Sequence, residues 1–331
     1  MSARWNVRPP GSNWGDFGPD DQLGRLNLIT PEKVLQGVAE VREGLRFCLS
    51  LPLDLPGGNY HDLRRLPPRL APVVKDGRVK YHLHANPRHT DVFSDDWVTL
   101  YPQFSTQWDA LGHVGSMFDA DGDGMPEPRS YNGFRPGEVI TGDGFTGLPA
   151  LGIENMAATG VQGRGVLIDL FAAYGPERRI VGYDDLMRVC EADNVTVEPG
   201  DILCIHTGQA SALLAEGKTP RHDTVENAFC HLDGCDEPLL RWIDDSGVAA
   251  IAADNFAVEA VPPREASPGK AYEGLHELCL FKLGIHLGEL WHLGPLAGWL
   301  KAHGRSCFLL TAPPLRLPGA AGSPVTPVAT V

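Results

Sequence analysis

Three short apolar runs in the second half of the chain do most to limit the folds that it can adopt. They cover residues 165–170, 200–208 and 248–253, and each begins at a glycine or directly after one. Runs of this length are typical of strands that are buried on both faces. Segments with apolar residues at helical spacing, 184–193 and 238–245, lie between them. This alternation of strands and helices predicts a mixed α/β fold.

The first half is dominated by short strand-like segments and turns. One helix is expected over residues 31–41, with Thr30 as its N-cap, Pro31 at its first position and its apolar side chains facing a sheet. The 38 glycines and 28 prolines are spread along the chain, which favours many short strands in one compact unit. We expect a single domain over residues 1–331, with an N-terminal extension at 1–12. The tail, 313–331, keeps apolar residues, so it should pack on the domain or on a partner subunit.

The charge balance excludes several classes of partner. The formal net charge is −14, so no basic surface is expected to bind nucleic acid or an anionic membrane. No apolar run approaches the length of about 20 residues that a membrane span needs, and the N-terminus has no signal-like apolar region. The seven cysteines lack a Cys-x-x-Cys pair, which favours reduced thiols and a cytoplasmic protein. A small-molecule substrate is therefore the expected partner.

An amide, a carboxylate and an imidazole fall close together in residues 105–113. Gln107 and Asp109 would share one face at the end of a strand, and His113 follows after a short turn. A buried polar network would also bring these groups together, because buried polar side chains need hydrogen-bond partners. This stretch alone does not decide between a network and a metal site.

A second group of polar residues lies near the end of the chain and favours a metal site. His276 begins a helix-like segment that Gly284 ends, and Glu289 stands in a following strand-like segment, 285–290. Metal ligands typically come from several elements that meet at one edge of a sheet. The sequence therefore predicts one centre built from both stretches.

Residues 103–113 also resemble a known signature, His-x-Gly-Thr-His-x-Asp-x-Pro-x-His. Thr106, Asp109 and His113 match it, whereas Gln103 and Gln107 stand where the signature has histidines. The signature belongs to the cyclase-like metal-dependent hydrolases, which include bacterial kynurenine formamidase and isatin hydrolase. The similarity extends over most of the chain and includes the segments 200–208 and 322–324, the loop at Asp254, and the pair His276 and Glu289.

The resemblance implies a single domain with mixed sheets layered against helices, of the swivelling β/β/α kind, and a homodimer or homotetramer. It also implies a divalent metal held by a set drawn from Gln107, Asp109, His113, His276 and Glu289. His113, as proton shuttle, and Glu289 are the expected catalytic residues. Manganese or zinc is the expected metal, with magnesium as an alternative. A glutamine oxygen is a harder and weaker ligand than imidazole, so Gln107 shifts the balance from zinc toward manganese or magnesium.

The expected reaction is hydrolysis of a small cyclic or aromatic amide, lactone or ester by a metal-activated water. Gln107 either binds the metal or donates to the developing oxyanion. Substrate contacts are expected from Gln103 and from four aromatic residues, of which at least two should be core residues instead: Trp97, Tyr101, Trp108 and Trp291. A metal-dependent lyase or dehydratase, and a small-molecule-binding homologue without activity, are the alternatives.

Residues 142–147 have the letters of a dinucleotide-binding loop. Pro149 and Gly152 interrupt the helix that should follow such a loop, and no ribose-binding acid stands at the expected distance. The sequence therefore predicts a turn here and no nucleotide cofactor.

Overall fold

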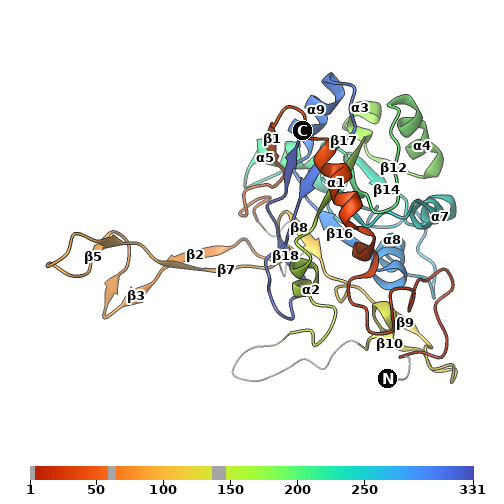
Figure 1. Ribbon diagram of the computed structural model, residues 1–331, viewed down its shortest axis with the longest axis horizontal. Coiled ribbons are helices and arrows are strands. Elements are labelled where there is room, and N and C mark those ends of the chain that lie inside the picture. Colours follow the sequence, from red (N-terminus) through yellow and green to blue (C-terminus); the bar gives the residue numbers. More distant parts are fainter. Residues whose placement is uncertain (1–3, 59–64, 136–146) are drawn as a thin grey trace.

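The computed structural model describes residues 4–58, 65–135 and 147–331. Within these residues, nine strands form a central sheet in the order β1-β19-β17-β11-β13-β15-β16-β8-β18 (Figure 1). Their bounds are β1 Arg46–Cys48, β8 Gln107–Asp109, β11 Gln162–Asp169, β13 Ile202–His206, β15 Ala250–Ala253, β16 His286–Glu289, β17 Cys307–Thr311, β18 Gly322–Pro324 and β19 Val328–Thr330.

The middle of the sheet is parallel and both sides are antiparallel. β11, β13, β15 and β16 run in one direction, whereas β17 pairs antiparallel with β11, and β8 pairs antiparallel with β16. The three apolar runs of the sequence are β11, β13 and β15, and all residues of β13 and β15 are buried. The predicted mixed α/β fold is thus confirmed.

Helices cover both faces of the sheet, and each face has its own apolar core. Along β15, Ile251 and Ala253 belong to one core, and Ala250 and Ala252 belong to the other, as strand alternation requires. The first core is covered by α4 Tyr183–Ala192, α7 Glu237–Ser246, α8 Gly274–His276 and the π-helix η3 Glu277–Leu283; the second is covered by α2 Ile153–Ala158 and α9 Gly294–Ala302.

The remaining elements are short. The helices are η1 Gly24–Leu28, η2 Tyr131–Gly133, α3 Leu170–Tyr174, α5 Gln209–Glu216 and α6 His222–Glu226. Two small sheets pair β9 Ser116–Phe118 with β10 Glu127–Arg129, and β12 Arg179–Val181 with β14 Cys230–Leu232. No helix in the described ranges is both long enough and apolar enough to cross a membrane.

Helix α1, Pro31–Ala39, begins as predicted, because Thr30 accepts a hydrogen bond from the Lys33 backbone N–H at 3.3 Å. The helix packs on the central sheet as expected, but not mainly through its apolar side chains. Leu35 is 66% exposed, and Gly37 packs instead against the backbone of β11, where an added Cβ would lie 2.8 Å from Gly163. The helix therefore lies too close to the strand for a large side chain at the contact.

The tail, expected to be an extended segment, supplies β18 and β19 to the central sheet. β18 pairs with β8, so the edge strand beside Gln107 and Asp109 comes from the end of the chain. The segment 142–146 of the predicted turn lies outside the described residues, as do residues 1–3 of the predicted N-terminal extension.

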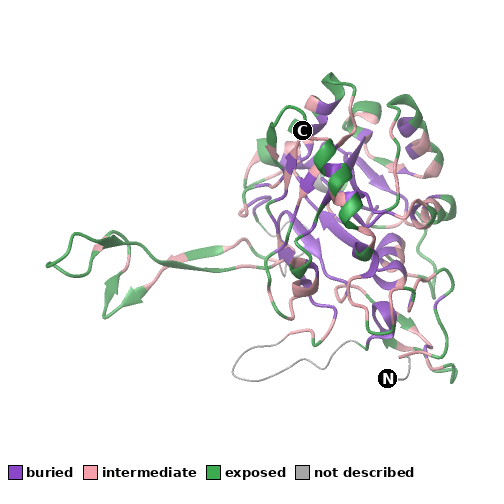
Figure 2. Cartoon of the chain, viewed as in Figure 1, coloured by how far each residue is buried: buried purple, intermediate pink, exposed green. Residues whose placement is uncertain are grey.

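Residues 69–99 form an arm that projects from the body (Figure 1). It consists of three antiparallel ribbons: β2 Arg69–Pro72 with β7 Asp96–Thr99, β3 Val74–Lys75 with β4 Arg78–Val79, and β5 Leu83–His84 with β6 Val92–Phe93. Most of the arm is exposed, in contrast to the buried strands of the body (Figure 2).

Candidate metal centre

The sheet brings the two polar stretches of the sequence together. β8 and β16 are neighbours, and Gln107 lies directly opposite Glu289. Gln107 and Asp109 share a face of β8, as predicted, and this is the face of Glu289. His276, the last residue of α8, adds an imidazole from the helix layer. Two strands and one helix therefore supply the side chains of one site.

Three of these side chains form a cluster with the geometry of a cation site. One ligand atom each from Asp109, His276 and Glu289 lie within 4.8 Å of one another, and all three residues are buried. Asp109 Oδ2 is buried without a hydrogen-bond partner. An unpaired buried carboxylate oxygen is costly, and a cation would satisfy it. The residues present thus fit a divalent metal ion.

The side-chain amide of Gln107 has a preferred orientation. Its nitrogen satisfies two backbone carbonyl oxygens, those of Ser105 at 3.1 Å and Gln103 at 2.9 Å. The other amide position, 3.4 Å from Asp109 Oδ1, is then occupied by the carbonyl oxygen. Two oxygen atoms that face each other in a buried site favour a cation between them.

Burial and the neighbouring charges shift the pKa values of the three cluster residues. Burial raises the pKa of Asp109 to about 6; the charge of His113 counteracts this rise, and that of Glu289 adds to it. Burial would lower the pKa of His276, but hydrogen bonds to Glu259 and Glu289 raise it well above the usual value. For Glu289, burial is outweighed by the hydrogen bond to His276, and the pKa is lowered. A metal must displace a proton from His276, so binding should release protons.

His113 lies beside this cluster and is not a member of it. Its Nε2 is 3.8 Å from Asp109 Oδ1, and its side chain is 22% exposed, whereas that of Asp109 is fully buried. His113 thus stands between the cluster and solvent. This position suits a group that exchanges protons better than it suits a metal ligand.

Glu259 is a site residue that the sequence did not predict. Its Oε1 accepts hydrogen bonds from Nδ1 of His276 at 2.8 Å and from the His276 backbone N–H at 2.9 Å. Its Oε2 accepts from the Leu275 backbone N–H at 3.0 Å. The proton of His276 is thereby held on Nδ1, which leaves Nε2 to face Glu289 at 3.5 Å.

The loop that carries Glu259 also reaches Glu289. The Ala257 backbone forms a hydrogen bond with Glu289 that helps to lower the pKa of this carboxylate. Ala257 and Val258 have φ angles of 65° and 60°, and this left-handed conformation is strained for a β-branched residue. Strain of this kind occurs where the surrounding structure fixes the backbone, so one loop after β15 positions two of the three cluster residues.

Thr106 joins the two strands at the base of the site. Its hydroxyl donates to the backbone oxygen of Leu290 at 2.5 Å and accepts from the Leu51 backbone N–H at 2.9 Å. The signature threonine is therefore a buried connector between the start of β8 and the end of β16.

The predicted substrate-binding residues lie in different places. Trp108 and Trp291 are fully buried and stack edge to face, with ring centroids 4.8 Å apart, on the opposite face of the sheet from Asp109. These two residues are core residues, because alternation along β8 directs Trp108 away from the cluster. Trp97 belongs to the arm and is 52% exposed.

Two predicted substrate-binding residues lie on the segment that connects the arm to β8. Tyr101 is 40% exposed. Gln103 touches the site through its backbone oxygen, and its side chain fills the space beside Gly322, where an added Cβ would lie 2.6 Å from Nε2. Neither residue belongs to the cation cluster.

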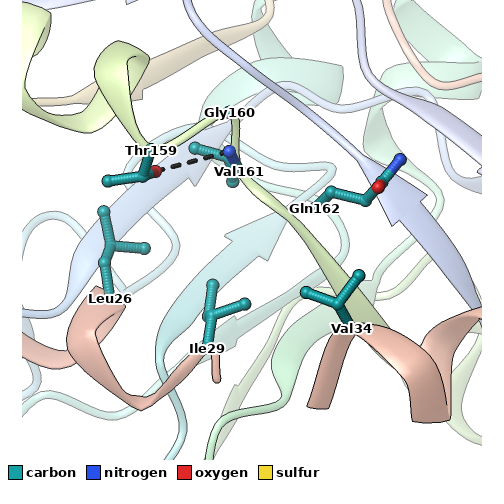
Figure 3. Close-up of a pocket in the computed structure, with 7 residues that line it drawn as sticks. All are labelled: Leu26, Ile29, Val34, Thr159, Gly160, Val161 and Gln162. Atoms are coloured by element: carbon teal, nitrogen blue, oxygen red, sulfur yellow. Dashed lines mark hydrogen bonds between the residues drawn. The ribbon is translucent and has the colours of Figure 1, made fainter. Parts of the chain in front are cut away.

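A separate cavity of about 300 Å³ opens between η1, α1 and the start of β11 (Figure 3). Its wall is formed by Leu26, Ile29, Val34, Thr159, Gly160, Val161 and Gln162. None of these side chains is titratable, and Thr159 already accepts a hydrogen bond from the Val161 backbone at 3.4 Å. This cavity therefore offers no acid or base.

A bound metal ion is expected to raise the melting temperature of the protein. A divalent cation at 100 times its dissociation constant is expected to stabilise the folded protein by about 2.7 kcal/mol, because the unfolded chain lacks the assembled cluster. The melting temperature of chelator-treated protein should therefore rise on addition of Mn²⁺. Scanning fluorimetry with Mn²⁺, Zn²⁺ and Mg²⁺ measures this rise; three flat titrations would contradict the metal site.

Comparison with known proteins identifies the family. Residues 49–260 match the family described as "Putative cyclase". The crystal structure of a novel cyclase is 33% identical, with a TM-score of 0.78 over 97% of this chain and 99% of that chain. Two structures share the fold at lower identity. Isatin hydrolase A from Labrenzia aggregata is 13% identical, with a TM-score of 0.58 over 90% of this chain and 97% of its own.

Isatin hydrolase A from Ralstonia solanacearum also shares the fold. It is 14% identical, with a TM-score of 0.56 over 91% of this chain and 97% of its own. No curated protein matches the sequence. The family match covers more than half of the chain, and the novel cyclase resembles it from end to end. This chain therefore belongs to the cyclase family.

Proposed function

We propose that this protein is a metal-dependent hydrolase that cleaves a small amide, lactone or ester with a cyclic or aromatic group. The proposal rests on the buried cluster of Asp109, His276 and Glu289, with a partly exposed His113 at its edge. The fold shared with the isatin hydrolases is consistent with it.

Asp109, His276, Glu289 and the amide oxygen of Gln107 would hold the metal. One imidazole and three oxygen donors favour Mn²⁺ or Mg²⁺ over Zn²⁺, which prefers nitrogen and sulfur ligands. When bound, the cation supplies Lewis acidity, which polarises a carbonyl group and makes water acidic at neutral pH. Asp109 and Glu289 would offset the charge of the cation.

His113 would carry the proton. Its imidazole can take a proton from the attacking water and return it to the leaving nitrogen or oxygen. Asp109, 3.8 Å from His113 Nε2, would stabilise the imidazolium that forms between these steps. Gln107 is assigned to the metal and not to the oxyanion, because its N–H groups point toward the backbone oxygens of Ser105 and Gln103.

Turnover of a substrate panel by the Mn²⁺-loaded protein tests this function. Aryl formamides, lactones and cyclic imides are expected to release a proton on hydrolysis, which a pH indicator reports. His113→Ala should lower kcat by about 10²- to 10⁴-fold and leave the metal content unchanged. His222→Ala is a matched control, because His222 is 72% exposed and lies on α6.

Two outcomes would contradict the proposal. If turnover yields a new double bond without a proton-releasing acid product, the protein is a lyase. If the metal-loaded protein binds panel compounds and converts none of them, it is a binding homologue.

A further inference from the structure

Arg65 stands at the edge of the candidate metal centre, on the segment just before β2. Its Nη1 donates a hydrogen bond to the Gln103 backbone oxygen at 3.2 Å, and the same oxygen accepts one from the Gln107 amide at 2.9 Å. Gln107 in turn lies directly opposite Glu289 in the sheet. A single backbone oxygen therefore separates the guanidinium group from a side chain of the centre.

The charge of Arg65 acts on both carboxylates of the cluster. Burial raises the pKa of Asp109, and the charge of Arg65 counteracts part of this rise. Burial would also raise the pKa of Glu289, but the hydrogen bond to His276 lowers it, and the charge of Arg65 adds to this lowering. The guanidinium group thus lies within electrostatic reach of the cluster.

A bound metal ion would change the charge that surrounds Arg65. A divalent cation would offset the two negative charges of Asp109 and Glu289, so these carboxylates would no longer balance the guanidinium group. The metal ion and the guanidinium group also repel each other, and a negatively charged group between them relieves this repulsion. A fixed cation beside a metal site therefore favours a ligand that is itself an anion.

A carboxylate is the anion that suits this position. The guanidinium group is planar, keeps its charge at all ordinary pH values and binds a carboxylate through two parallel hydrogen bonds. Because it has five N–H groups, an arginine can hold a backbone oxygen and a carboxylate at the same time. The single positive charge of one arginine also matches the single negative charge of a carboxylate.

We propose that Arg65 binds a carboxylate of the substrate, which would be a small amide, lactone or ester that carries an acid group besides the bond that is cleaved. The identity of the cleaved bond rests on the proposed function. Recognition of a carboxylate by Arg65 does not, because it can be measured without turnover. Arg65 is in this view a specificity residue, and the proton transfers remain with His113.

Binding of benzenedicarboxylates to the Mn²⁺-loaded protein tests the proposal without any reaction. One carboxylate of phthalate, isophthalate or terephthalate can bind the metal ion, as the acid product of hydrolysis would, and the second can reach Arg65. In the monoamide of each compound, a neutral group of similar shape replaces one carboxylate. Isothermal titration should show that the wild type binds at least one diacid about 10- to 100-fold more tightly than its monoamide.

Two substitutions of Arg65 separate its charge from its hydrogen bonds. Arg65→Gln keeps an N–H donor but no charge, so the preference for the diacid should disappear. The same variant should bind Mn²⁺ at least as tightly as the wild type, because a like charge is removed. Arg65→Lys keeps the charge but not the planar pair of N–H groups, so it should recover part of the preference.

Arg69→Gln is the matched control. Arg69 is an exposed residue of β2, four positions further along the chain. This variant should keep both the preference for the diacid and the affinity for Mn²⁺, and circular dichroism should show that all variants are folded. A wild type that binds no diacid more tightly than its monoamide overturns the proposal, and so does a preference that persists in Arg65→Gln.

Turnover distinguishes a failure of this inference from a failure of the proposed function. Each compound of the substrate panel is paired with a form that carries a carboxylate on its ring. Arg65→Gln should lower kcat/KM about 10- to 100-fold for the carboxylate forms and leave the neutral forms unchanged. An equal loss for both forms overturns the role of Arg65. A preference for the diacid that depends on Arg65, without turnover of any compound, contradicts the hydrolase function alone.

Discussion

Asp109→Asn is expected to weaken metal binding by about 100-fold or more, because the loss of a ligand costs more than the loss of a carboxylate that only orients one. The substitution keeps the shape of the side chain but removes the negative charge at the centre of the cluster, where Oδ2 has no other partner. Isothermal titration with Mn²⁺ measures the affinity. Activity on any substrate of the wild type should be lost together with the metal.

The same substitution should stabilise the metal-free protein. Because burial raises the pKa of Asp109 from 3.8 to about 6, the folded state holds its proton more tightly than the unfolded state does. Protonated Asp109 therefore contributes to the stability of the folded protein at low pH, and this contribution is lost as the pH rises from about 4 through 6. Asparagine carries no such charge, so the variant should melt at a higher temperature than the metal-free wild type at pH 8.

Asp123→Asn provides the control, because Asp123 lies in an exposed loop and is not a member of the cluster. It should change neither the affinity for Mn²⁺ nor the pH dependence of melting. If Asp109→Asn binds Mn²⁺ as tightly as the wild type, Asp109 is not a ligand and the centre has been assigned to the wrong residues.

Glu259→Ala is expected to weaken metal binding about 10- to 100-fold, the usual cost of removing a carboxylate that orients a histidine ligand. Without Glu259, the His276 ring loses the acceptor that holds its proton on Nδ1, and two backbone N–H groups, those of Leu275 and His276, are left unpaired. Each unpaired buried group costs about 1–3 kcal/mol, so the melting temperature should also fall.

Glu259→Gln separates positioning from stability. Its amide oxygen can still accept from Nδ1 of His276, so metal affinity should recover in part relative to alanine. Glu265→Gln, an exposed residue a few positions along the chain, should match the wild type. A Glu259→Ala protein that melts earlier but binds Mn²⁺ with unchanged affinity would mean that Glu259 supports the fold alone.

The sequence predicted the parts of the site that lie close together along strands. Gln107 and Asp109 stand two positions apart on one strand, and a glycine separates the helix of His276 from the strand of Glu289, so their elements could be inferred from local pattern. Their meeting depends on β8 pairing with β16, a contact between distant segments. The sequence predicted one centre built from both stretches, but not the strand pairing that forms it.

Glu259 was missed because nothing local marks it. It stands among apolar residues after β15, and its partner His276 is 17 positions away and reaches it only through the fold. The two tryptophans show the opposite case. Trp108 and Trp291 lie next to site residues in the sequence, but strand alternation and close packing place them in the core behind the sheet.

The amide of Gln107 has a consequence for the acidity range in which the centre can work. An imidazole ligand must lose a proton to bind a metal, so acid competes with the metal at each histidine. An amide oxygen carries no proton to lose. Gln107 therefore adds no proton to the two that a metal must displace in mildly acidic solution, one at His276 and, below a pH of about 6, one at Asp109.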